Sequence, residues 1–298
     1  MTFLVINVMP GNAASQLLGA NATPDQVAEL EAKLHLDEPV LQQYVQWLGN
    51  VVRGDFGNSF ASDQPVTSII GERLPVTLEL IVFSFVVSLA LTVPVAVIAA
   101  RRPGWIVDRL SMGVSMVGLS VAPYVLALVL VYVFAVELDV LPAIYVSVGE
   151  GGLAQHLRSM ILPAVSIGFP LFCFYTRLLR ADIVDKMQGE DYVVTAQAKG
   201  LGPWHVLLRH ALPNSLFGLL TLVSLNIGTL IGATVVIESI FAMPGIGQAL
   251  LQSINNRDIL VLEAIVLVLA TIVVLANLLA DVLYAVLDPR IRYERPAS

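Results

Sequence analysis

The sequence predicts an all-α, polytopic membrane protein, and two features of its 298 residues carry that prediction. Apolar residues (AVILMFWYC) make up 57% of the chain and charged residues only 13%, about half the charged share of a soluble domain. The mean hydropathy is +0.81. Five apolar stretches also come close to the roughly 20 residues that a helix needs to cross a bilayer. Such a composition excludes a disordered chain, a disulfide-stapled secreted domain and a free nucleic-acid-binding protein.

The five stretches predict five complete transmembrane helices. They are Val76–Ala100, Met112–Val136, Met160–Thr176, Ser215–Ile237 and Ile259–Leu287. The third is short and contains Pro163 and Pro170, which packed membrane helices tolerate. Four carboxylates lie toward the span ends, where structural roles are more common than proton relays. These are Glu79, Glu238, Glu263 and Asp281.

The first 75 residues predict an incomplete helix followed by an external region. Thr2–Met9 is apolar but far too short to cross a membrane, so residues 1–10 are expected to be the remnant of a first transmembrane helix. Residues 11–75 form the external region. Thr23–Gln26 predicts the start of a short helix toward Leu34, and a second helix is expected after Pro39 with an apolar stripe on one face. That stripe either packs on the protein's own helices or lies on the outer membrane surface.

Basic residues predict the orientation, because Lys and Arg accumulate in cytoplasmic loops. Arg101–Ser111, Arg177–Pro213 and the tail from Asp288 together hold eleven of the sixteen Lys and Arg residues. These segments are therefore predicted to be cytoplasmic, together with the C-terminus. Residues 11–75, 137–159 and 241–258 are predicted to be external, and that side carries a net negative charge.

Reactive groups are too scarce for an enzyme. None of the four histidines lies in a predicted span, and the sequence contains no HExxH pair, no GxSxG elbow and no phosphate-binding loop. The single cysteine, Cys173, cannot form an internal disulfide. No cofactor is predicted, and if the protein uses ATP, another chain must bind the nucleotide.

The longest predicted cytoplasmic loop has a distinct pattern. Glu190 and Asp191 suit the beginning of a helix that Thr195–Lys199 can continue, and Gly200 and Gly202 can end it. From these residues alone two interpretations stay open. The segment is either a connector whose charges set the topology, or a short helix whose small residues let a partner approach closely.

A resemblance favours the partner. Asp191–Leu201 and Arg209–Asn214 resemble the cytoplasmic loop of ATP-binding-cassette (ABC) importer permeases. Val194, Thr195 and His210 depart from the general Glu-Ala-Ala pattern of that loop, but they are typical of the dipeptide/oligopeptide/nickel branch.

Three further stretches resemble the same branch and its first permease subunit. Gly54–Ser59 is similar to an external Gly-Asp-x-Gly-x-Ser segment, and Glu238–Gly247 is similar to the turn after the fifth helix. Asp281–Arg292 is similar to the C-terminal Asp-x-x-Tyr-x-x-x-Asp-Pro-Arg ending. The resemblance covers the chain from about Val8 onward.

This resemblance implies a type I ABC importer permease in the bacterial cytoplasmic membrane. Residues 76–287 would form the permease domain, residues 177–213 its cytoplasmic coupling loop and residues 288–298 a cytoplasmic tail. The implied partners are a second homologous permease, two ATPase subunits that bind the ATP, an external substrate-binding protein and the lipid bilayer. Short peptides are the expected cargo; nickel, glutathione or another small solute is the alternative, and a secondary transporter is the alternative from a different class.

The resemblance also implies which residues act. Ala196, Ala198 and Gly200 are expected to contact the ATPase, while Leu212 and Pro213 fix where the loop rejoins the fifth span. The full set of expected coupling residues is Thr195, Ala196, Ala198, Lys199, Gly200, Leu212 and Pro213. Asn226 and Thr229 are the candidates for the translocation path, and Gly228–Gly232 has the GxxxG spacing of close helix packing.

Overall fold

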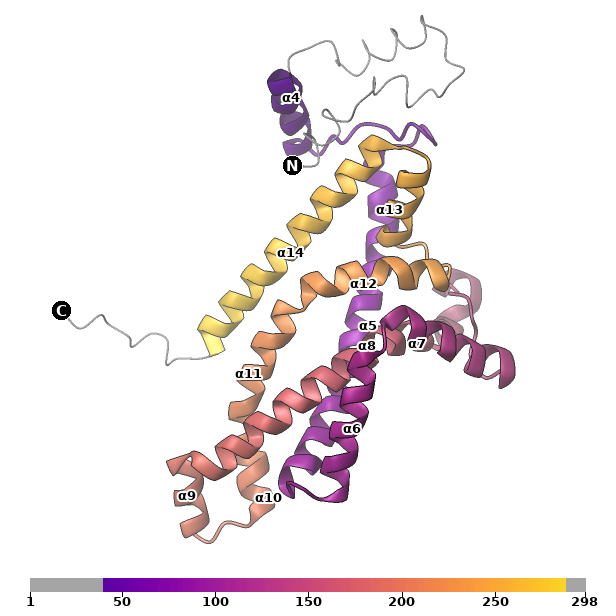
Figure 1. Ribbon diagram of the computed structural model, residues 1–298. Coiled ribbons are helices and arrows are strands. Elements are labelled where there is room, and N and C mark those ends of the chain that lie inside the picture. The colour runs from indigo at the N-terminus through magenta and orange to yellow at the C-terminus, as the bar shows by residue number, and fades with distance from the viewer. Residues whose placement is uncertain (1–39, 288–298) are drawn as a thin grey trace, which may run out of the picture. The chain divides into compact units, whose positions relative to one another are not determined.

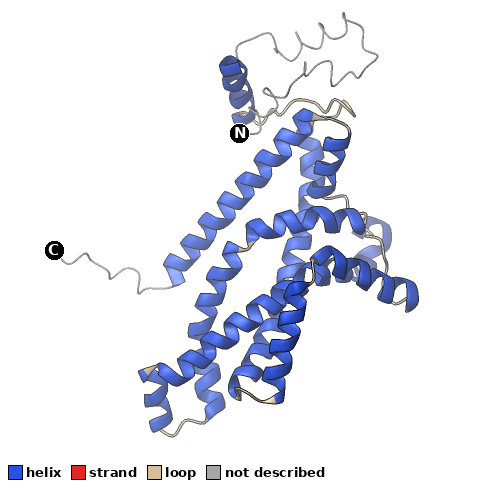
Figure 2. Cartoon of the chain, in the orientation of Figure 1, coloured by secondary structure: helices blue, strands red, loops and turns tan. Residues whose placement is uncertain are grey.

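The computed structural model describes residues 40–287, and in this part of the chain every helix or strand assigned is a helix (Figures 1 and 2). One isolated bridge joins Asn58 and Pro65. The predicted helix remnant at residues 1–10, the short helix expected over residues 23–34 and the tail at residues 288–298 lie outside the described residues.

The helices follow one another with short connections. In chain order they are α4 (Val40–Val52), α5 (Val66–Arg101), α6 (Ile106–Ser120), α7 (Pro123–Leu130), the π-helix η1 (Val131–Glu137), α8 (Val148–Gly189), α9 (Asp191–Ala198), α10 (Pro203–Val206), the π-helix η2 (Leu207–Ala211), α11 (Leu212–Leu225), α12 (Ile227–Ile240), α13 (Ile246–Asn255) and α14 (Ile259–Leu287).

Within residues 40–287, four helical stretches are long and apolar enough to cross a membrane, and a fifth candidate is a bent pair. The four lie in α5, in α8, in the continuous run from α10 to α11, and in α14. Helices α6 and α7 with η1 qualify together, but they are bent by 102° at a break that precedes Pro123. The structure thus supports a multi-pass membrane protein.

Two predicted spans are not straight helices. Met112–Val136 contains the break between α6 and α7, where proline begins the second helix, as its missing N–H favours. Ser215–Ile237 is divided into α11 and α12 at Asn226. The side-chain amide of Asn226 donates to the carbonyl of Leu222 at 2.8 Å, a local bond of the kind that competes with regular helix bonding.

The predicted loop 177–213 is largely helical. Helix α8 continues for thirteen residues beyond the predicted end of the third span, to Gly189, and α10, η2 and α11 follow one another without a gap. Between residues 177 and 213, only Glu190 and residues 199–202 lie outside helices.

The described chain forms two compact units. The first combines residues 40–75 with residues 248–271 and therefore contains α4, the beginning of α5, α13 and the beginning of α14. Val45, Leu48 and Val52 of α4 are exposed. Of the two interpretations of the apolar stripe, packing on the protein's own helices does not hold for these three side chains.

The second unit combines residues 76–247 with residues 272–287 and contains the candidate site. A hydrophobic core of this unit joins α5, α8, η2 and α11 around the fully buried Tyr175. The other buried members of this cluster are Ala96, Val97, Ala100, Leu179, Ile183, Leu207, Ala211 and Leu219. Burial of this apolar surface gives the second half of α8 a rigid support.

Candidate functional site

The candidate site is the segment of residues 190–211, which we call the coupling segment. It follows the end of α8 and consists of α9, a four-residue turn, α10 and η2; Figure 1 shows α9 and α10 side by side beyond the end of α8. Asp191 lies in the first turn of α9, where an acidic side chain interacts favourably with the helix dipole. Helix α9 is confirmed where the sequence predicted it.

Helix α9 has an inner and an outer face. Val193 and Ala196 are buried and pack against Val206 of α10, with Met187 and Tyr192 at the edge of this small core. The remaining residues of α9 and its C-terminal cap face outward. The exposed set is Asp191, Val194, Thr195, Gln197, Ala198 and Lys199.

Ala196 is therefore placed differently from the expectation. Only 5% of its surface is exposed, because helical spacing puts residues 193 and 196 on the same face. Its side chain holds α9 onto α10 and is not available for a direct contact with a partner. Thr195, Ala198 and Lys199 are exposed, as a docking surface requires.

Gly200 ends α9 in a left-handed conformation. Its φ is +81°, its N–H donates to the carbonyl of Gln197, and the N–H of Leu201 reaches back to Ala196. A side chain other than glycine would be strained in this conformation. Among the described residues, and apart from its immediate chain neighbours, no heavy atom lies within 4 Å of the position that a Cβ would take, so the space beside Gly200 is open.

Leu212 and Pro213 begin α11, where the segment rejoins the predicted span. Leu212 is half-buried and packs on the core cluster, whereas Pro213 is exposed. Proline cannot donate to the carbonyl four residues earlier, that of Arg209, and the π-helix η2 occupies this place. The two residues thus lie inside the continuous helical run from Pro203 to Leu225, and their role in fixing where the loop rejoins the fifth span stays a prediction.

Polar and cation–π contacts hold together the helices on either side of the coupling segment and tie α10 to α5. Nζ of Lys186, near the end of α8, donates to the carbonyl of Asn214 at 2.7 Å and to Asp182 at 2.8 Å. The guanidinium of Arg101 lies 4.3 Å from the ring centre of Trp204, a cation–π contact between α5 and α10.

An ion pair joins Arg180 of α8 to Asp108 of α6. Nε and Nη2 of Arg180 donate to the two carboxylate oxygens of Asp108 at 2.8 and 2.7 Å, and the N–H of Gly104 donates to the same carboxylate at 2.7 Å. Asp108 is buried, and this bidentate geometry is the strong form of an arginine–carboxylate pair. Sequence reasoning missed it because the partners are 72 residues apart.

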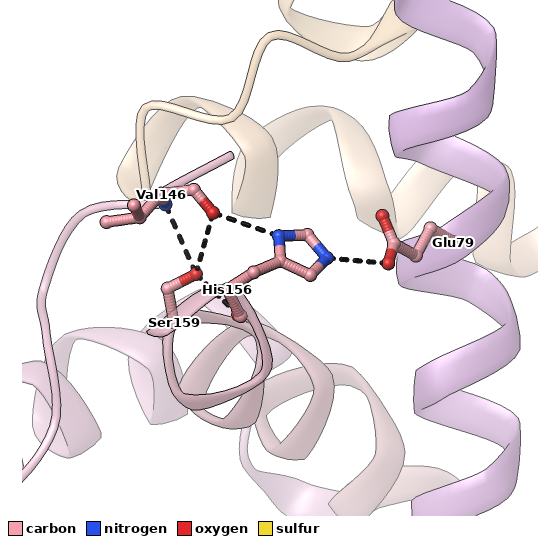
Figure 3. A network of polar contacts seen from close by, with 4 residues as sticks. All are labelled: Glu79, Val146, His156 and Ser159. Carbon is pink, nitrogen blue, oxygen red and sulfur yellow. Dashed lines mark hydrogen bonds and ion pairs between the residues drawn. The ribbon is translucent and has the colours of Figure 1, made fainter. Parts of the chain in front are cut away.

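A second polar region of the same unit surrounds His156 (Figure 3). Nε2 of the buried His156 lies 2.7 Å from Oε1 of Glu79, and Nδ1 lies 2.9 Å from the carbonyl oxygen of Val146. Ser159 donates to the carbonyl of His156 and accepts from the N–H of Val146. With Glu79 ionised, both ring contacts end on acceptors, so a ring that donates from both nitrogens satisfies them together.

Tyr145 covers the histidine ring. Its own ring lies edge-on at 5.5 Å, and its N–H donates to the carbonyl of Phe241. Burial raises the pKa of Tyr145, and the charges of Glu79 and Glu150 raise it further, so its hydroxyl stays protonated at neutral pH. The segment before α8 is thereby held to α8 and to the end of α12, while His156 joins α8 to α5.

The turn that begins at Glu238 is closed around a buried carboxylate. Thr77 Oγ1 donates to Oε1 of Glu238 at 2.7 Å and accepts from the N–H of Ile246 at 2.8 Å. A Cβ on Gly245 would collide with the Glu238 carboxylate. This packing explains why the Pro-Gly-x-Gly turn follows Glu238; we call Thr77, Glu238 and the turn to Gly247 the Glu238 cluster.

The candidates for the translocation path take different positions. Asn226 is half-buried at the break between α11 and α12, and Thr229 is exposed on α12. Within the GxxxG motif, a Cβ on Gly228 would lie 3.3 Å from Val273 of α14, whereas Gly232 has open space. The first glycine therefore serves packing within this chain.

Known proteins resemble this chain over nearly its full length. The family described as binding-protein-dependent transport system inner membrane component matches residues 92–293, and its N-terminal family matches residues 1–81. A probable peptide ABC transporter permease of Sinorhizobium fredii is 36% identical, covering 98% of this chain and 93% of that protein. A dipeptide transport system permease of Alkalihalophilus pseudofirmus is 34% identical, with 98% and 94% coverage. A glutathione transport system permease of Escherichia coli K12 is 36% identical, with 99% and 93% coverage.

A solved structure shares the fold. A chain of the MetNI methionine ABC transporter matches 74% of this chain and 96% of its own length, with a TM-score of 0.60 and 17% sequence identity. This likeness confirms the type I permease fold that the resemblance implied. Together with the family match and the relatives above, it shows that the chain belongs to the binding-protein-dependent transport system inner membrane components, the permease subunits of ABC importers.

Proposed function

We propose that this permease subunit forms, with a second homologous permease, the path by which short peptides enter the cell, and that its coupling segment docks on an ATPase subunit. The single observation that carries the docking proposal is the construction of α9. A short helix is fixed from inside by Val193, Ala196 and Val206, while Thr195, Ala198 and Lys199 stay exposed next to the open space at Gly200.

The proposed mechanism is rigid-body transmission. When two ATPase subunits close on ATP, the docked α9 moves with them, and the small core and the Lys186–Asn214 contact oblige the end of α8 and the start of α11 to follow. Helix α8 also carries His156, which contacts Glu79 of α5, and it extends about 50 Å from His156 to Gly189. A displacement at α9 is thus passed along one element to the opposite end of α8.

The names of relatives support the peptide cargo. Two of the relatives described above are named as peptide or dipeptide permeases, and one as a glutathione permease. Glutathione is the second candidate because it is itself a small peptide-like solute. The family membership excludes the secondary-transporter alternative.

The distribution of Lys and Arg supports the orientation. With the coupling segment and the C-terminus in the cytoplasm, residues 53–75 and α13 face outward, where a substrate-binding protein delivers cargo. Asn226 and Thr229 are proposed to face the path, since the break at Asn226 interrupts the helix at a polar residue. No step of ATP hydrolysis is assigned to this chain.

Reconstitution of the complete importer tests the proposal. The permease pair, both ATPases and the peptide-loaded binding protein are placed in proteoliposomes, and ATP-dependent uptake of a labelled dipeptide is measured beside uptake of labelled glutathione. We expect dipeptide uptake that requires the binding protein. Uptake of glutathione without any dipeptide would contradict the peptide proposal, and uptake without the binding protein would contradict the assembly.

Thiol labelling tests the orientation. Gln42→Cys and Gln197→Cys are each placed in a Cys173→Ala background, and both parent side chains are exposed. An impermeant thiol reagent should label residue 42 from outside intact cells and residue 197 only in inverted vesicles. Labelling of both from the same side would contradict the topology.

A further inference from the structure

One buried ring joins three parts of the second compact unit (Figure 3). Nδ1 of His156 lies 2.9 Å from the carbonyl oxygen of Val146 in the segment before α8, and Nε2 lies 2.7 Å from Oε1 of Glu79 on α5. Only 2% of the His156 side chain is exposed, so water has little access to the ring. Both distances are those of hydrogen bonds, and each gap therefore holds a hydrogen.

The contact with Glu79 depends on one titratable proton. A carbonyl oxygen only accepts, so Nδ1 of His156 must carry a proton of its own. The hydrogen between Nε2 and Oε1 then belongs either to a doubly protonated ring or to a protonated Glu79. When this proton leaves, the ring lone pair and the carboxylate are two buried acceptors that face each other at hydrogen-bond distance. Such an arrangement is unfavourable, so the contact opens.

The pair can exchange its proton although the ring is buried. The side chain of Glu79 is 33% exposed, and it lies near the beginning of the predicted first span, where a carboxylate can reach water. Proton exchange through Glu79 therefore needs no opening of the core around His156.

Other ionisable groups around the ring have positions or partners of their own. Tyr145 lies edge-on against the ring, and its hydroxyl stays protonated at neutral pH. On α8, Glu150 belongs to the capping box, and Arg158 donates to a carbonyl of the preceding segment. On α12, Glu238 accepts from a hydroxyl of α5. The titration of the contact therefore belongs to His156 and its carboxylate partner.

We propose that the His156–Glu79 pair is a proton-sensitive latch between α5 and α8, which is closed at acidic external pH and opens at alkaline external pH. The closed latch contains one more proton than the open latch, so its stability is lost as the pH rises. This proposal rests on the proposed function, which places this end of α8 outside and makes α8 the element that transmits movement. An open latch frees α8 from α5, so movement of α8 is passed on less completely and peptide uptake falls.

Dipeptide uptake by the complete importer in proteoliposomes tests the latch, with ATP at constant pH inside and the binding protein outside. When the external pH is raised from about 6.5 to about 8.5, uptake by the unmodified importer should fall at least about threefold. Glu79→Gln should reduce this fall to less than about 1.5-fold, because the glutamine amide donates to Nε2 of a neutral ring and needs no titratable proton.

Glu150→Gln is the matched control. It removes an exposed acid near the same ring but keeps the capping box, which glutamine also completes. Its pH dependence should equal that of the unmodified importer. Any effect of pH on the binding protein itself is common to all these measurements and cancels in the comparison.

A second variant and a second measurement keep the test independent of transport. His156→Gln removes the titrating ring and should also flatten the pH dependence of uptake. The melting temperature of the purified unmodified permease pair should fall relative to that of Glu79→Gln over the same pH range.

The proposal is overturned if Glu79→Gln and His156→Gln keep the pH dependence of the unmodified importer, or if Glu150→Gln flattens it as well. A difference in melting temperature that does not change with pH also overturns it, because the contact is then only structural. The proposed function fails separately, if the unmodified importer takes up no dipeptide at either pH. In that case the melting measurement still decides whether the pair is a latch.

Discussion

The coupling segment and the Glu238 cluster lie in the same compact unit but differ in the exposure of their side chains. In the coupling segment, α9 buries two apolar side chains and leaves Thr195, Ala198 and Lys199 without close packing. In the Glu238 cluster, a buried carboxylate, a buried hydroxyl and a glycine turn are closed against one another. Two motifs of the same family resemblance therefore serve different ends. One presents an exposed surface, on which we propose that an ATPase subunit docks, and the other completes the fold.

The largest expected effect is a loss of peptide uptake on substitution of Gly200, which lies in the proposed docking surface. Gly200→Glu places a residue with a side chain in the left-handed backbone conformation, which costs about 1–2 kcal/mol. It also places a charge in the proposed interface, where an unpaired charge costs several kcal/mol. Since about 1.4 kcal/mol corresponds to a tenfold change, peptide uptake should fall at least about a hundredfold. Uptake and permease abundance are measured in the same proteoliposomes and membranes.

Gly200→Asn is the control for backbone strain, because asparagine tolerates the left-handed region. It should retain much more uptake than Gly200→Glu at equal abundance. Normal uptake by Gly200→Glu would show that this open space is not part of a tight interface.

Glu238→Ala should damage stability instead of coupling. The substitution removes the acceptor of Thr77 Oγ1 and leaves a cavity beside Gly245, so we expect a loss of about 3 kcal/mol in the free energy of unfolding. The purified permease pair should melt several degrees lower and accumulate poorly. Ser239→Ala is the matched control, because Ser239 is exposed and its hydroxyl only bonds back to Val235. Equal melting of the two variants would contradict the structural role of the cluster.

The difference between these regions also decides what could be predicted from the sequence. Apolar length predicted the membrane helices, and the local order of acids and glycines predicted α9, because both signals lie within a few turns of chain. The inward turn of Ala196 follows only once α10 returns beside α9 and Val206 takes its place. Contacts such as Thr77–Glu238 and Glu79–His156 join residues 161 and 77 positions apart, and no local pattern marks the partners.

Asp108→Ala tests whether the Asp108–Arg180 ion pair, which supports α8 ahead of the coupling segment, contributes to stability as the Glu238 cluster does. Loss of the carboxylate leaves the Arg180 guanidinium and the N–H of Gly104 without their acceptor, which we expect to cost about 2 kcal/mol of stability. The melting temperature should fall less than in Glu238→Ala, and binding-protein-stimulated ATPase activity should fall with it. Asp185→Ala is the control and should change neither quantity, because Asp185 is an exposed acid on α8, the helix that carries Arg180. A fall in melting temperature with full coupling would show that the position of α8 is not limiting for transmission.

The smallest expected effect is that of substituting Trp204, where α10 of the coupling segment contacts Arg101 at the end of α5. Cation–π contacts at exposed sites contribute about 0.5–1 kcal/mol, and Trp204, whose ring lies against Arg101, is 39% exposed. Trp204→Leu keeps an apolar side chain but removes the ring, so α10 should be held less firmly against α5. Coupling efficiency should therefore fall about two- to fivefold. Trp204→Phe retains an aromatic face and should lie between Trp204→Leu and the unmodified protein. ATP hydrolysed per peptide transported is the quantity to measure, because a small change in docking alters this ratio before it alters abundance. If Trp204→Leu matches the unmodified protein, then the buried contact of Val193 and Ala196 with Val206 is sufficient to position α9, and the Arg101 contact is an incidental feature of the surface.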